Sequence, residues 1–594
     1  MPARTATGGA SVGNKKLSMV ILGINAYHAD SSAAIFVDGK LVAAIEEERF
    51  RRIKHWAGFP EQSVLFCLKE AGIGFENVDH FAIGRDPKAK FFRKLLYLIK
   101  NPSGSFSAVK NRLENAKKVA TLENELSKIS GLAPDIFKNK IRQVEHHRSH
   151  IASAFFASPF EEAACVSIDG SGDFTTTMIA IGKGNEIEVL ESVDFPNSIG
   201  IFYTAFTQLL GFPHYGDEYK VMGMAPYGEP KYIDKLEDVI YLQKNGLFSL
   251  NLKYFRKGTE GVISYGEDHL PVVQPMYSNE MIELFGPPRK REDALTQYHK
   301  DLAASVQRIT EQTVFHIIES LQKRTGLENL CVAGGVAQNS VVNGKIKTNT
   351  SFRNIYIPAA GHDAGIAMGA ALYVQHQLLK HERMPANLSA YTGSHFSNEE
   401  IKFLLYSQKI KFEEYEDEIL FDKITDCIIK GGVVGWFTGR AEFGPRALGG
   451  RSIIADPRRT DAKEILNCKI KKRESFRPFA PSILKEYVSE YFEQTDEVPF
   501  MEKVFLIKPS KRDQIPAVTH VDGSGRLQTV DKNISPRYYQ LIDTFFKKTG
   551  IPILLNTSFN ENEPIVNSPG DALSCYLRTE MDMLVMENIL VSRK

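Results

Sequence analysis

Three histidines lie within five positions in the segment VEHHRSHIASAF, residues 144–155, just ahead of an apolar run. On a helix, His146 and His150 stand four positions apart, so both rings share one face with Cβ atoms about 5–6 Å apart. Two imidazoles at that spacing can bind one cation. The same spacing is common for hydrogen-bonded histidines at a helix end, so carboxylates from elsewhere must complete a metal site.

Two aspartates are candidates for this purpose. Asp169 ends the apolar strand CVSID, and Asp363 opens a helical pattern that follows another strand. Ligands gather at the carboxyl ends of strands in open α/β sheets. Together with the histidines they form a nitrogen and oxygen set suited to Fe(II), Mn(II) or Zn(II). His28 lies in a turn facing the same cleft, either as general base for an alcohol or as a hydrogen-bonded turn residue.

The elements that carry these residues look duplicated. Residues 19–50 and 166–195 each read as a strand, a turn of small residues and a second strand. When Ile24 is aligned with Ile168, 144 positions later, the two segments align without a gap, and His28 aligns with Gly172. Two such units with Gly/Ser/Thr-rich turns can grip the phosphates of a nucleotide between them. Two unrelated hairpins are the alternative.

Helical patterns follow these units, at residues 61–73, 150–158, 199–212 and 301–326. The segment NLCVAGGVAQN then runs from a strand through Gly334 and Gly335 toward a helix, a junction that lets backbone approach a base or a phosphate. A polar, turn-rich stretch begins at residue 381. We therefore expect a disordered leader at 1–17, one domain at 18–385 and a second domain at 386–594.

The second domain contains a concentrated basic patch. Residues 440–477 hold eleven Lys or Arg against five Asp or Glu, punctuated by Gly and Pro. Arginine forks fixed on turns can bind phosphate or carboxylate oxygens in pairs. An RNA-binding or ordinary basic surface is the alternative. The strand and loop of ILLNTSFN, with Asn556 and Ser558, and a loop containing Arg526 add polar groups that could orient a ligand.

Composition limits the class of protein. A chain of 594 residues is long enough for two or more cores. Its net charge of +1 provides no general attraction to nucleic acid or to an anionic membrane. The six cysteines are far apart, which is typical of a reducing compartment, and no apolar run approaches a membrane span. We expect a cytoplasmic protein without membrane contact.

Ten motifs recur in order from about residue 19 to the C-terminus: HADSSAA, EEERFRRIKHWAGFP, EHHRSH, IDGSGD, GDEYKVMGMAPYG, GGVAQN, GHDAG, GRAEFGPRALGGRSI, RESFRPFAP and NTSFN. Together they resemble the O-carbamoyltransferases of antibiotic and nodulation-factor biosynthesis. The resemblance implies an α/β chain whose N-terminal domain has an actin-like ATPase fold, built from a duplicated RNase H-like unit. This domain would be similar to the threonylcarbamoyl-transfer enzyme of tRNA modification. The resemblance also implies a C-terminal α+β domain similar to threonylcarbamoyl-adenylate synthase.

The activity implied by this resemblance has two steps. Carbamoyl phosphate and ATP, with Mg²⁺, give carbamoyl-adenylate and pyrophosphate, and the carbamoyl group then passes to a hydroxyl of a small natural product. The resemblance implies a metal site, with iron the expected ion, whose ligands are His146, His150, Asp169 and Asp363. It implies that His28 is the base that activates the acceptor. The implied binding residues for carbamoyl phosphate and the adenylate are Arg446, Lys471, Arg477, Arg526 and Ser558. Candidate nucleotide or acceptor contacts are Lys220, Gly334, Gly335, Asn339 and Asn556.

Two rival functions remain open at this point. An actin-like small-molecule kinase would use the duplicated turns but not the arginine patch, and a tRNA threonylcarbamoyl-type enzyme would use that patch for RNA. Segments 85–140 and 230–290 match no motif, and we expect acceptor recognition there. The sequence does not indicate the acceptor itself, and a homodimer is a further expectation.

Overall fold

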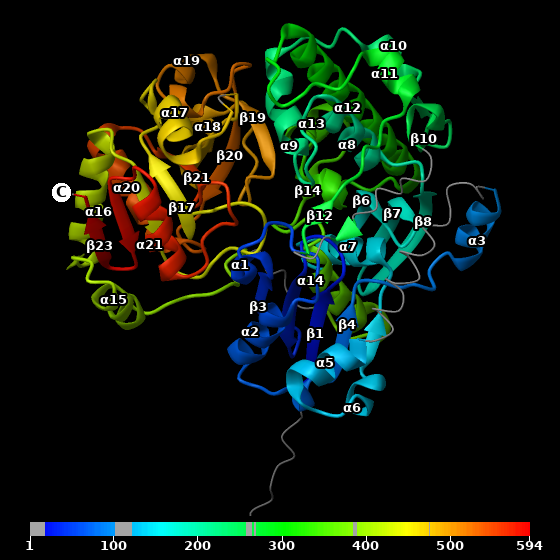
Figure 1. Cartoon of the computed structure of the whole chain (residues 1–594), viewed down its shortest axis with the longest axis horizontal. Helices are drawn as coiled ribbons and strands as arrows, with labels where there is room; N and C mark the ends of the chain where they lie inside the picture. The colour runs from blue at the N-terminus through cyan, green and yellow to red at the C-terminus, as the bar shows by residue number, and fades with distance from the viewer. Residues whose placement is uncertain are drawn as a thin grey trace, which may run out of the picture.

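The computed structural model describes residues 18–100, 122–256, 264–265, 269–383, 389–474 and 476–593. The predicted leader, residues 1–17, and the predicted domain boundary at 385/386 lie outside these ranges. Figure 1 shows the N-terminal part, from blue to green, beside a C-terminal part that runs from yellow to red. The expected α/β class is confirmed.

The first sheet has the order β3-β2-β1-β4-β5. Its strands are β1 (Val20–Asn25), β2 (Ser32–Val37), β3 (Lys40–Glu46), β4 (His80–Ile83) and β5 (Ile141–Gln143). Strand β1 is central in this sheet, where it pairs antiparallel with β2 and parallel with β4, and it is buried throughout because helices such as α14 (Gly365–Leu372) pack on the sheet. The predicted reversal between β2 and β3 is confirmed at Asp38 and Gly39, both with positive φ.

The second sheet has the order β14-β13-β6-β7-β8. Its strands are β6 (Glu162–Gly172), β7 (Thr175–Lys183), β8 (Glu186–Asp194), β13 (Asn329–Ala333) and β14 (Asn354–Tyr356). Ile24 pairs with Ala33 in the first sheet, and Ile168 pairs with Thr177 in the second. Both partners are shifted by the same 144 positions, so the predicted duplication is confirmed down to the register.

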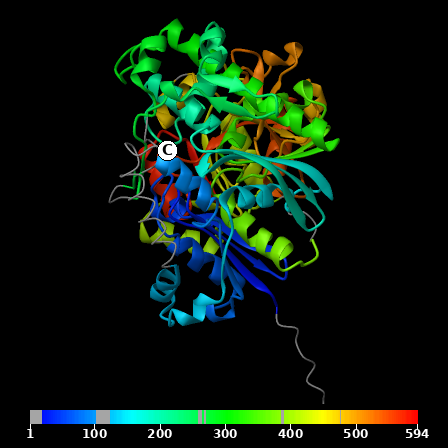
Figure 2. The ribbon, with the colours of Figure 1, turned by 90° about the vertical axis from the view of Figure 1, so that its right-hand side faces the viewer.

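Helices cover both sheets and join them (Figures 1 and 2). The longer helices of this part are α2 (Glu61–Ala71), α3 (Phe91–Lys100), α5 (Leu122–Ser130), α7 (His146–Phe155), α8 (Ile199–Leu209), α12 (Gln297–Thr325), α13 (Ser340–Asn349) and α14 (Gly365–Leu372). Shorter ones are α1 (Glu48–Arg51), α6 (Asp135–Lys138), α9 (Glu218–Met224), α10 (Ile233–Glu237) and α11 (Asn279–Phe285). The four helical patterns predicted from the sequence all fall on such helices.

Helices α7 and α14 pack against each other between the two sheets, because small residues allow their backbones to approach closely. A Cβ atom at Gly369 would lie 1.8 Å from the carbonyl oxygen of Ser149, and one at Gly23 of β1 would lie 1.8 Å from that of Ala367. Beyond α14 the chain continues as a π-helix, Tyr373–Leu378. These contacts fix the first turns of α7 and α14 relative to each other.

The C-terminal domain is built on a nine-stranded mixed sheet with the order β15-β23-β22-β16-β17-β21-β18-β20-β19. Its strands are β15 (Glu413–Glu414), β16 (Val434–Phe437), β17 (Arg451–Ala455), β18 (Ala480–Leu484), β19 (Lys503–Leu506), β20 (Ser524–Val530), β21 (Ile553–Ser558), β22 (Met583–Met586) and β23 (Ile589–Ser592). Its main helices are α15 (Asn398–Ser407), α16 (Asp417–Ile429), α20 (Pro536–Thr549) and α21 (Pro569–Arg578). Fully buried Trp436 anchors the core and donates from Nε1 to Gly449 O at 2.7 Å.

Side chains at the end of β3 hold the two domains together. Glu46 Oε1 accepts from Gly444 N at 2.6 Å, and Arg49 Nη2 donates to Gly444 O at 2.8 Å. Arg52 donates to the carbonyl oxygens of Pro564 and Ile565 at 2.6 and 2.7 Å. Because Glu46 and Arg49 are buried, this seam is part of the protein interior.

Candidate active site

The histidine pair lies at the start of α7, where Glu145 caps the helix by accepting from Arg148 N at 2.8 Å. Both rings are buried, and their centroids are 4.7 Å apart. His147, between them, points elsewhere and contacts Ser167 Oγ at 2.9 Å and Thr175 O at 3.0 Å. Helical spacing therefore selects the outer two histidines for one shared space.

Two carboxylates from the second half reach this space. His146 Nε2 lies 3.0 Å from Asp169 Oδ2 and 3.7 Å from Asp363 Oδ1. His150 Nε2 lies 3.4 Å from Asp169 Oδ2 and 3.3 Å from Asp363 Oδ1. The structure thus brings all four predicted ligands together, with their ligand atoms within 4.8 Å of one another and all four side chains buried.

The donor set fits a divalent cation. Donor atoms bound at about 2.1 Å around one tetrahedral ion are about 3.4 Å apart, which matches the spacing of these four groups. Within the described part of the chain, neither ring nitrogen of buried His150, nor Asp363 Oδ1, makes a hydrogen bond of proper geometry. Buried polar atoms without a partner are costly, and a cation would satisfy them.

The electrostatics of the cluster favour a positive charge between the two aspartates. Burial works against ionisation of both aspartates, yet the neighbouring histidines hold the pKa of Asp169 well below its usual range. Burial alone would lower the pKa of His150, but the two carboxylates outweigh it and raise this pKa to about 9. Two buried carboxylate charges require positive charge between them.

His28 contacts the cluster through a carboxylate oxygen that faces away from the histidine pair. Its Nδ1 lies 2.5 Å from Asp363 Oδ2, and its ring centroid is 5.1 Å from that of His146. Burial lowers the pKa of His28, but Asp363 outweighs this and raises it. This close ion pair lies on Nδ1, and His28 also lines the adjoining cavity, which is the placement expected of an oriented base.

The first half positions the loop of Asp363 with two polar side chains. Asn25, at the end of β1, donates from Nδ2 to the carbonyl oxygens of Asp363 at 3.0 Å, Asp30 at 3.1 Å and Ala29 at 3.2 Å. Ser32 Oγ donates to Ala364 O at 2.7 Å. The motifs HADSSAA and GHDAG are therefore partners in one local structure.

The predicted arginines gather in the C-terminal domain. Burial lowers the pKa of Arg446 to about 10, and burial with the neighbouring Arg477 lowers that of Arg473 to about 10. Burial, followed by Arg446 and Arg473, holds the pKa of Arg526 well below its usual range. Arg473 Nη2, Arg477 Nε and Arg526 Nε have no hydrogen-bond partner among the described residues. Clustered, half-buried cations that repel one another and have unbonded N–H groups form a site for an anion.

Lys471 and Ser558 lie beside these arginines. Lys471 is buried, and its Nζ contacts Ser558 O at 2.5 Å and both Asn560 O and Oδ1 at 2.7 Å. Burial holds its pKa well below the usual value. Ser558 Oγ lies 3.3 Å from the same Nζ, at the end of β21. An anion bound beside Lys471 would stabilise the protonated amine and so offset the lowering of its pKa by burial.

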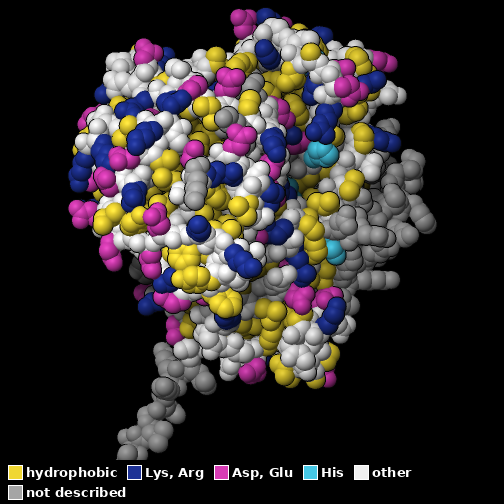
Figure 3. Space-filling view, turned by 60° about the vertical axis from the view of Figure 1, so that its left-hand side comes forward, with side chains coloured by type: hydrophobic (Ala, Val, Ile, Leu, Met, Phe, Trp, Pro, Cys, Tyr) yellow, Lys and Arg dark blue, Asp and Glu magenta, His cyan; other side chains and the backbone are white. Residues whose placement is uncertain are grey.

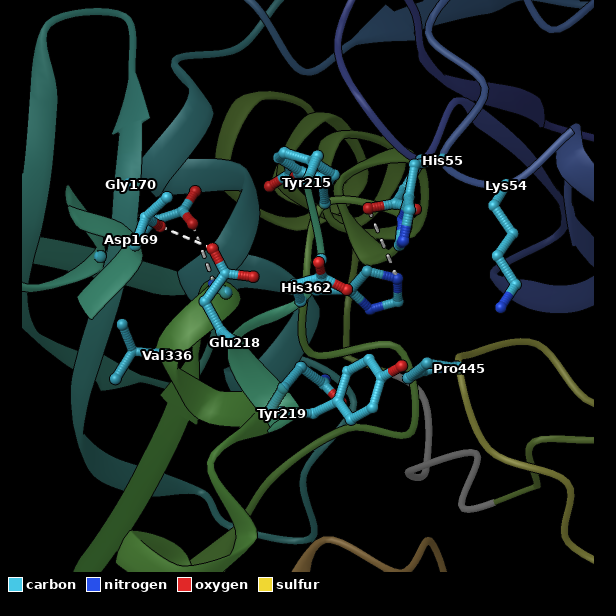
Figure 4. Close-up of a pocket in the computed structure, with 18 of the residues that line it drawn as sticks. Lys54, His55, Asp169, Gly170, Tyr215, Glu218, Tyr219, Val336, His362 and Pro445 are labelled. Carbon is cyan, nitrogen blue, oxygen red and sulfur yellow. Dashed lines mark hydrogen bonds and ion pairs between the residues drawn. The ribbon is translucent and has the colours of Figure 1, made fainter. Parts of the chain in front are cut away.

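One cavity of about 1090 Å³ joins the two groups. His28, His146, Asp169 and Asp363 line one end, whereas Arg446, Lys471, Arg473, Arg477, Arg526 and Ser558 line the other. His150 lies behind this wall. Figure 4 shows Asp169 and Glu218 on one side of the space and His55 and Lys54 on the opposite side. The cavity is large enough for a nucleotide and a second reactant.

The remaining predicted contacts divide into two groups. Lys220, Gly335, Asn339 and Asn556 line the cavity. Gly335 N donates to Asp169 Oδ1 at 3.1 Å, whereas Asn339 caps α13 and pairs with Gln307, and Asn556 donates to Ala447 O at 3.2 Å. Lys220 pairs with Asp217 at 2.6 Å. Gly334 lies outside the lining, at a φ of 92° that no other residue adopts easily.

Several cavity residues were not singled out from the sequence. His55 Nδ1 lies 2.8 Å from Asp30 Oδ1, Glu218 accepts from Thr204 Oγ1 at 2.6 Å, and Lys54 and Arg473 also line the wall. His55 and Lys54 belong to the motif EEERFRRIKHWAGFP, and Glu218 to GDEYKVMGMAPYG. The motifs were the available signal, but they contain no spacing that indicates which side chains turn inward.

Comparison with known families defines the class of protein. Residues 20–372 match the family described as Carbamoyltransferase N-terminus, and residues 425–593 match Carbamoyltransferase C-terminus. The chain therefore belongs to the carbamoyltransferase family, and it is an enzyme that transfers carbamoyl groups. The resemblance predicted from ten motifs is confirmed.

Relatives match along most or nearly all of the chain. A protein of Synechocystis sp. is 45% identical, with 96% of each chain covered. Nodulation protein NolNO of Sinorhizobium fredii is 38% identical over 96% of this chain and 80% of its own. Nodulation protein NolO of Bradyrhizobium diazoefficiens is 40% identical over 76% of this chain and 79% of its own.

Proposed function

We propose that this carbamoyltransferase is ATP-dependent and acts on a hydroxyl of a small molecule. The observation that carries the proposal is one cavity with a buried two-histidine, two-aspartate cluster at one end and, at the other, a cluster of arginines in which several N–H groups make no hydrogen bond among the described residues. The reactants at the arginine end must be strongly anionic, and the reactant at the other end must be activated beside His28.

At the arginine end, carbamoyl phosphate and water give carbamate and phosphate. A carbamate oxygen then attacks the α-phosphorus of ATP, which forms carbamoyl-adenylate and releases pyrophosphate. Both reactants are anions, so their approach requires the cations Arg446, Lys471, Arg473, Arg477 and Arg526 around them. Ser558 adds a hydroxyl donor, and Mg²⁺ accompanies ATP.

At the other end, the acceptor hydroxyl attacks the carbamoyl carbon, AMP leaves, and a carbamate ester forms. Nε2 of His28 takes the hydroxyl proton, while Asp363 fixes the ring through Nδ1. A divalent ion held by His146, His150, Asp169 and Asp363, for which we propose Fe(II), would supply Lewis acidity toward the carbamoyl carbonyl. Gly335 N keeps Asp169 in its orientation.

Product analysis tests the proposal. Purified protein is incubated with Mg·ATP, carbamoyl phosphate and a panel of hydroxylated compounds, and products are measured by mass spectrometry and ³¹P NMR. We expect one AMP, one pyrophosphate and one phosphate for each carbamate ester formed. ADP with a phosphorylated acceptor would instead establish a kinase and overturn the proposal.

Nucleic acid is not needed in this scheme. Acidic and basic side chains are interspersed over the face in Figure 3, and the cationic groups of the site line the wall of the cavity. Among the described residues, no helix has the length and apolarity that crossing a membrane requires. Binding of tRNA at low salt, with carbamoylation of that RNA, would favour the tRNA-modification alternative. Cytoplasmic location and a homodimer stay predictions.

A further inference from the structure

Helix α3 (Phe91–Lys100) carries an apolar stripe that faces solvent. The stripe consists of Phe91, Phe92, Leu95, Leu96 and Ile99, which are 45% to 78% exposed. Residues at this spacing lie on one side of a helix. Soluble proteins rarely leave so much contiguous apolar surface open, and a patch of this kind marks a binding surface.

The opposite side of α3 fastens the helix to the second half of the domain. Lys90 and Arg93 both pair with Asp194 at the end of β8. The ring of Tyr97 lies 5.7 Å from that of Phe174 and 5.5 Å from that of Phe195. These contacts hold the helix in a defined place, at the right of Figure 1 beside β8.

The stripe is continuous with the wall of the active-site cavity. Phe91 and Leu95 line this cavity, together with Lys94 of the same helix. Behind them the wall continues through the apolar side chains of Phe174, Ile201 and Met276, all three nearly buried. An apolar path therefore runs along the wall of the same cavity that His28 lines.

We propose that this path binds an apolar arm of the acceptor, so that the enzyme acts on an amphiphilic alcohol whose polar, hydroxyl-bearing end lies at His28. The inference rests on the proposed transfer to a hydroxyl. Ile99 lies eight positions after Phe91 on the helix, so the stripe can contact an arm over about 12 Å. A membrane surface or a second copy of the chain would bury the outer residues Phe92, Leu96 and Ile99, but neither explains why Phe91 and Leu95 face the reaction cavity.

The test uses two probes that share every hydroxyl and differ only in the arm: methyl β-D-glucoside and octyl β-D-glucoside below its micelle concentration. Affinities are measured by calorimetry on the full-length protein. We expect octyl glucoside to bind about ten-fold more tightly than methyl glucoside or better, because each buried methylene adds apolar contact. Phe91→Ser with Leu95→Ser should remove most of this preference.

A matched control is available in the other domain. Phe403 on α15 is 78% exposed and does not line the cavity, so Phe403→Ser should leave the preference unchanged. Circular dichroism establishes that each variant is folded. Equal affinity of the wild type for both probes, or a preference that survives the double substitution, would overturn the proposal.

Two further measurements identify the rival occupants. Sedimentation with phosphatidylcholine–phosphatidylglycerol vesicles that depends on Phe91 and Leu95, without any probe preference, would make α3 a membrane contact. A change of oligomeric state in the variant, again without a probe preference, would make it a subunit interface. Reaction products are assayed in parallel. If octyl glucoside still binds more tightly than methyl glucoside but no carbamate ester and no AMP form, the proposed function fails, whereas the apolar path remains a binding site for the arm.

Discussion

In the first half of the N-terminal domain β1 ends at Asn25, and in the second half β6 carries Asp169 at the equivalent position, 144 residues later. Asn25 donates to three carbonyl oxygens, whereas Asp169 faces the histidine pair. The two side chains have the same shape and differ in one amide group. One repeat uses this position to build the loop, and the other uses it to provide a negative ligand.

The turns that follow these strands differ in a related way. His28 of the first half aligns with Gly172 of the second. A Cβ atom at Gly172 would lie 2.1 Å from the ring of His146, so only glycine leaves room for that ligand. At the matching place in the other half, the space is filled by an imidazole that reaches Asp363. Equivalent strand order thus supports a site in which each half has its own chemical task.

Removing the ligands that the first half contributes should have the largest effect. His146→Ala combined with His150→Ala eliminates both nitrogen donors, so we expect complete loss of bound metal and of carbamoyl transfer. Pyrophosphate release should persist, because it occurs among the arginines of the other domain. Elemental analysis and a pyrophosphate assay check this, and wild-type transfer by the double variant would refute the ligand assignment.

The turn difference can be tested at His28. His28→Asn should slow carbamoyl transfer about 10²–10⁴-fold, the usual contribution of a general base, with metal content unchanged. Single-turnover measurement of ester formation separates this step from adenylate formation. His316→Asn is the control, since His316 contacts Gln243 O at 2.8 Å and does not line the cavity. Unchanged transfer in the His28 variant would exclude a base role.

The scaffold role of the first strand predicts a stability effect. Asn25→Asp would place a carboxylate against three carbonyl oxygens in a buried site, which should lower the free energy of unfolding by about 3–5 kcal/mol. Urea denaturation measures this. Asn185→Asp, at an exposed amide that bonds His381 O, should cost less than about 1 kcal/mol. Similar losses in the two variants would contradict the scaffold reading.

Glycine at position 172 offers a steric test. Gly172→Ala should push the ring of His146 aside and weaken metal affinity about 10–100-fold, as loss of ligand orientation commonly does. Gly170→Ala is a matched control, because no atom outside its neighbourhood lies within 4 Å of an added Cβ. Metal titration of the apoprotein compares them, and equal affinities would mean that the turn is more tolerant than its geometry indicates.

The smallest expected effect concerns the pair of His55 and Asp30. Burial opposes charge on His55, but Asp30 outweighs it and raises the His55 pKa to about 9, so the pair stabilises the fold fully below about pH 6.5 and less as pH rises through 9. The pKa of Asp30 is lowered, so its contribution is lost only in acid. Asp30→Asn should cost about 1–2 kcal/mol at pH 6 and little above pH 10, measured by urea denaturation. A pH-independent cost would exclude this charge pair.

Sequence patterns predicted those features that depend on local spacing. The offset of 144 residues gave the register of both hairpins, since side chains alternate along a strand and an alignment without gaps preserves that alternation. The four-residue spacing of His146 and His150 predicted their common face. Their meeting with Asp169 and Asp363 required only that the duplicated halves face each other.

Features that depend on distant packing were not accessible in this way. Helix α3 leaves its own half to pair with Asp194, Glu46 reaches Gly444 in the other domain, and His55 meets Asp30 through the path of a loop. No periodicity encodes such contacts, because they are set by how whole layers pack. The expectation of acceptor recognition at residues 85–140 stays a prediction, and the sequence pattern did not single out the apolar stripe of α3 within that segment.

The seam at Gly444 has a thermodynamic consequence. Both backbone polar groups of this glycine are bonded to Glu46 and Arg49, and Arg446 follows two positions later. Separating the domains would break the hydrogen bonds of Glu46 and Arg49 to Gly444, at about 1–3 kcal/mol for each bond. Melting of one domain therefore destabilises the other, and both chemical steps should disappear in a single cooperative transition as the temperature rises.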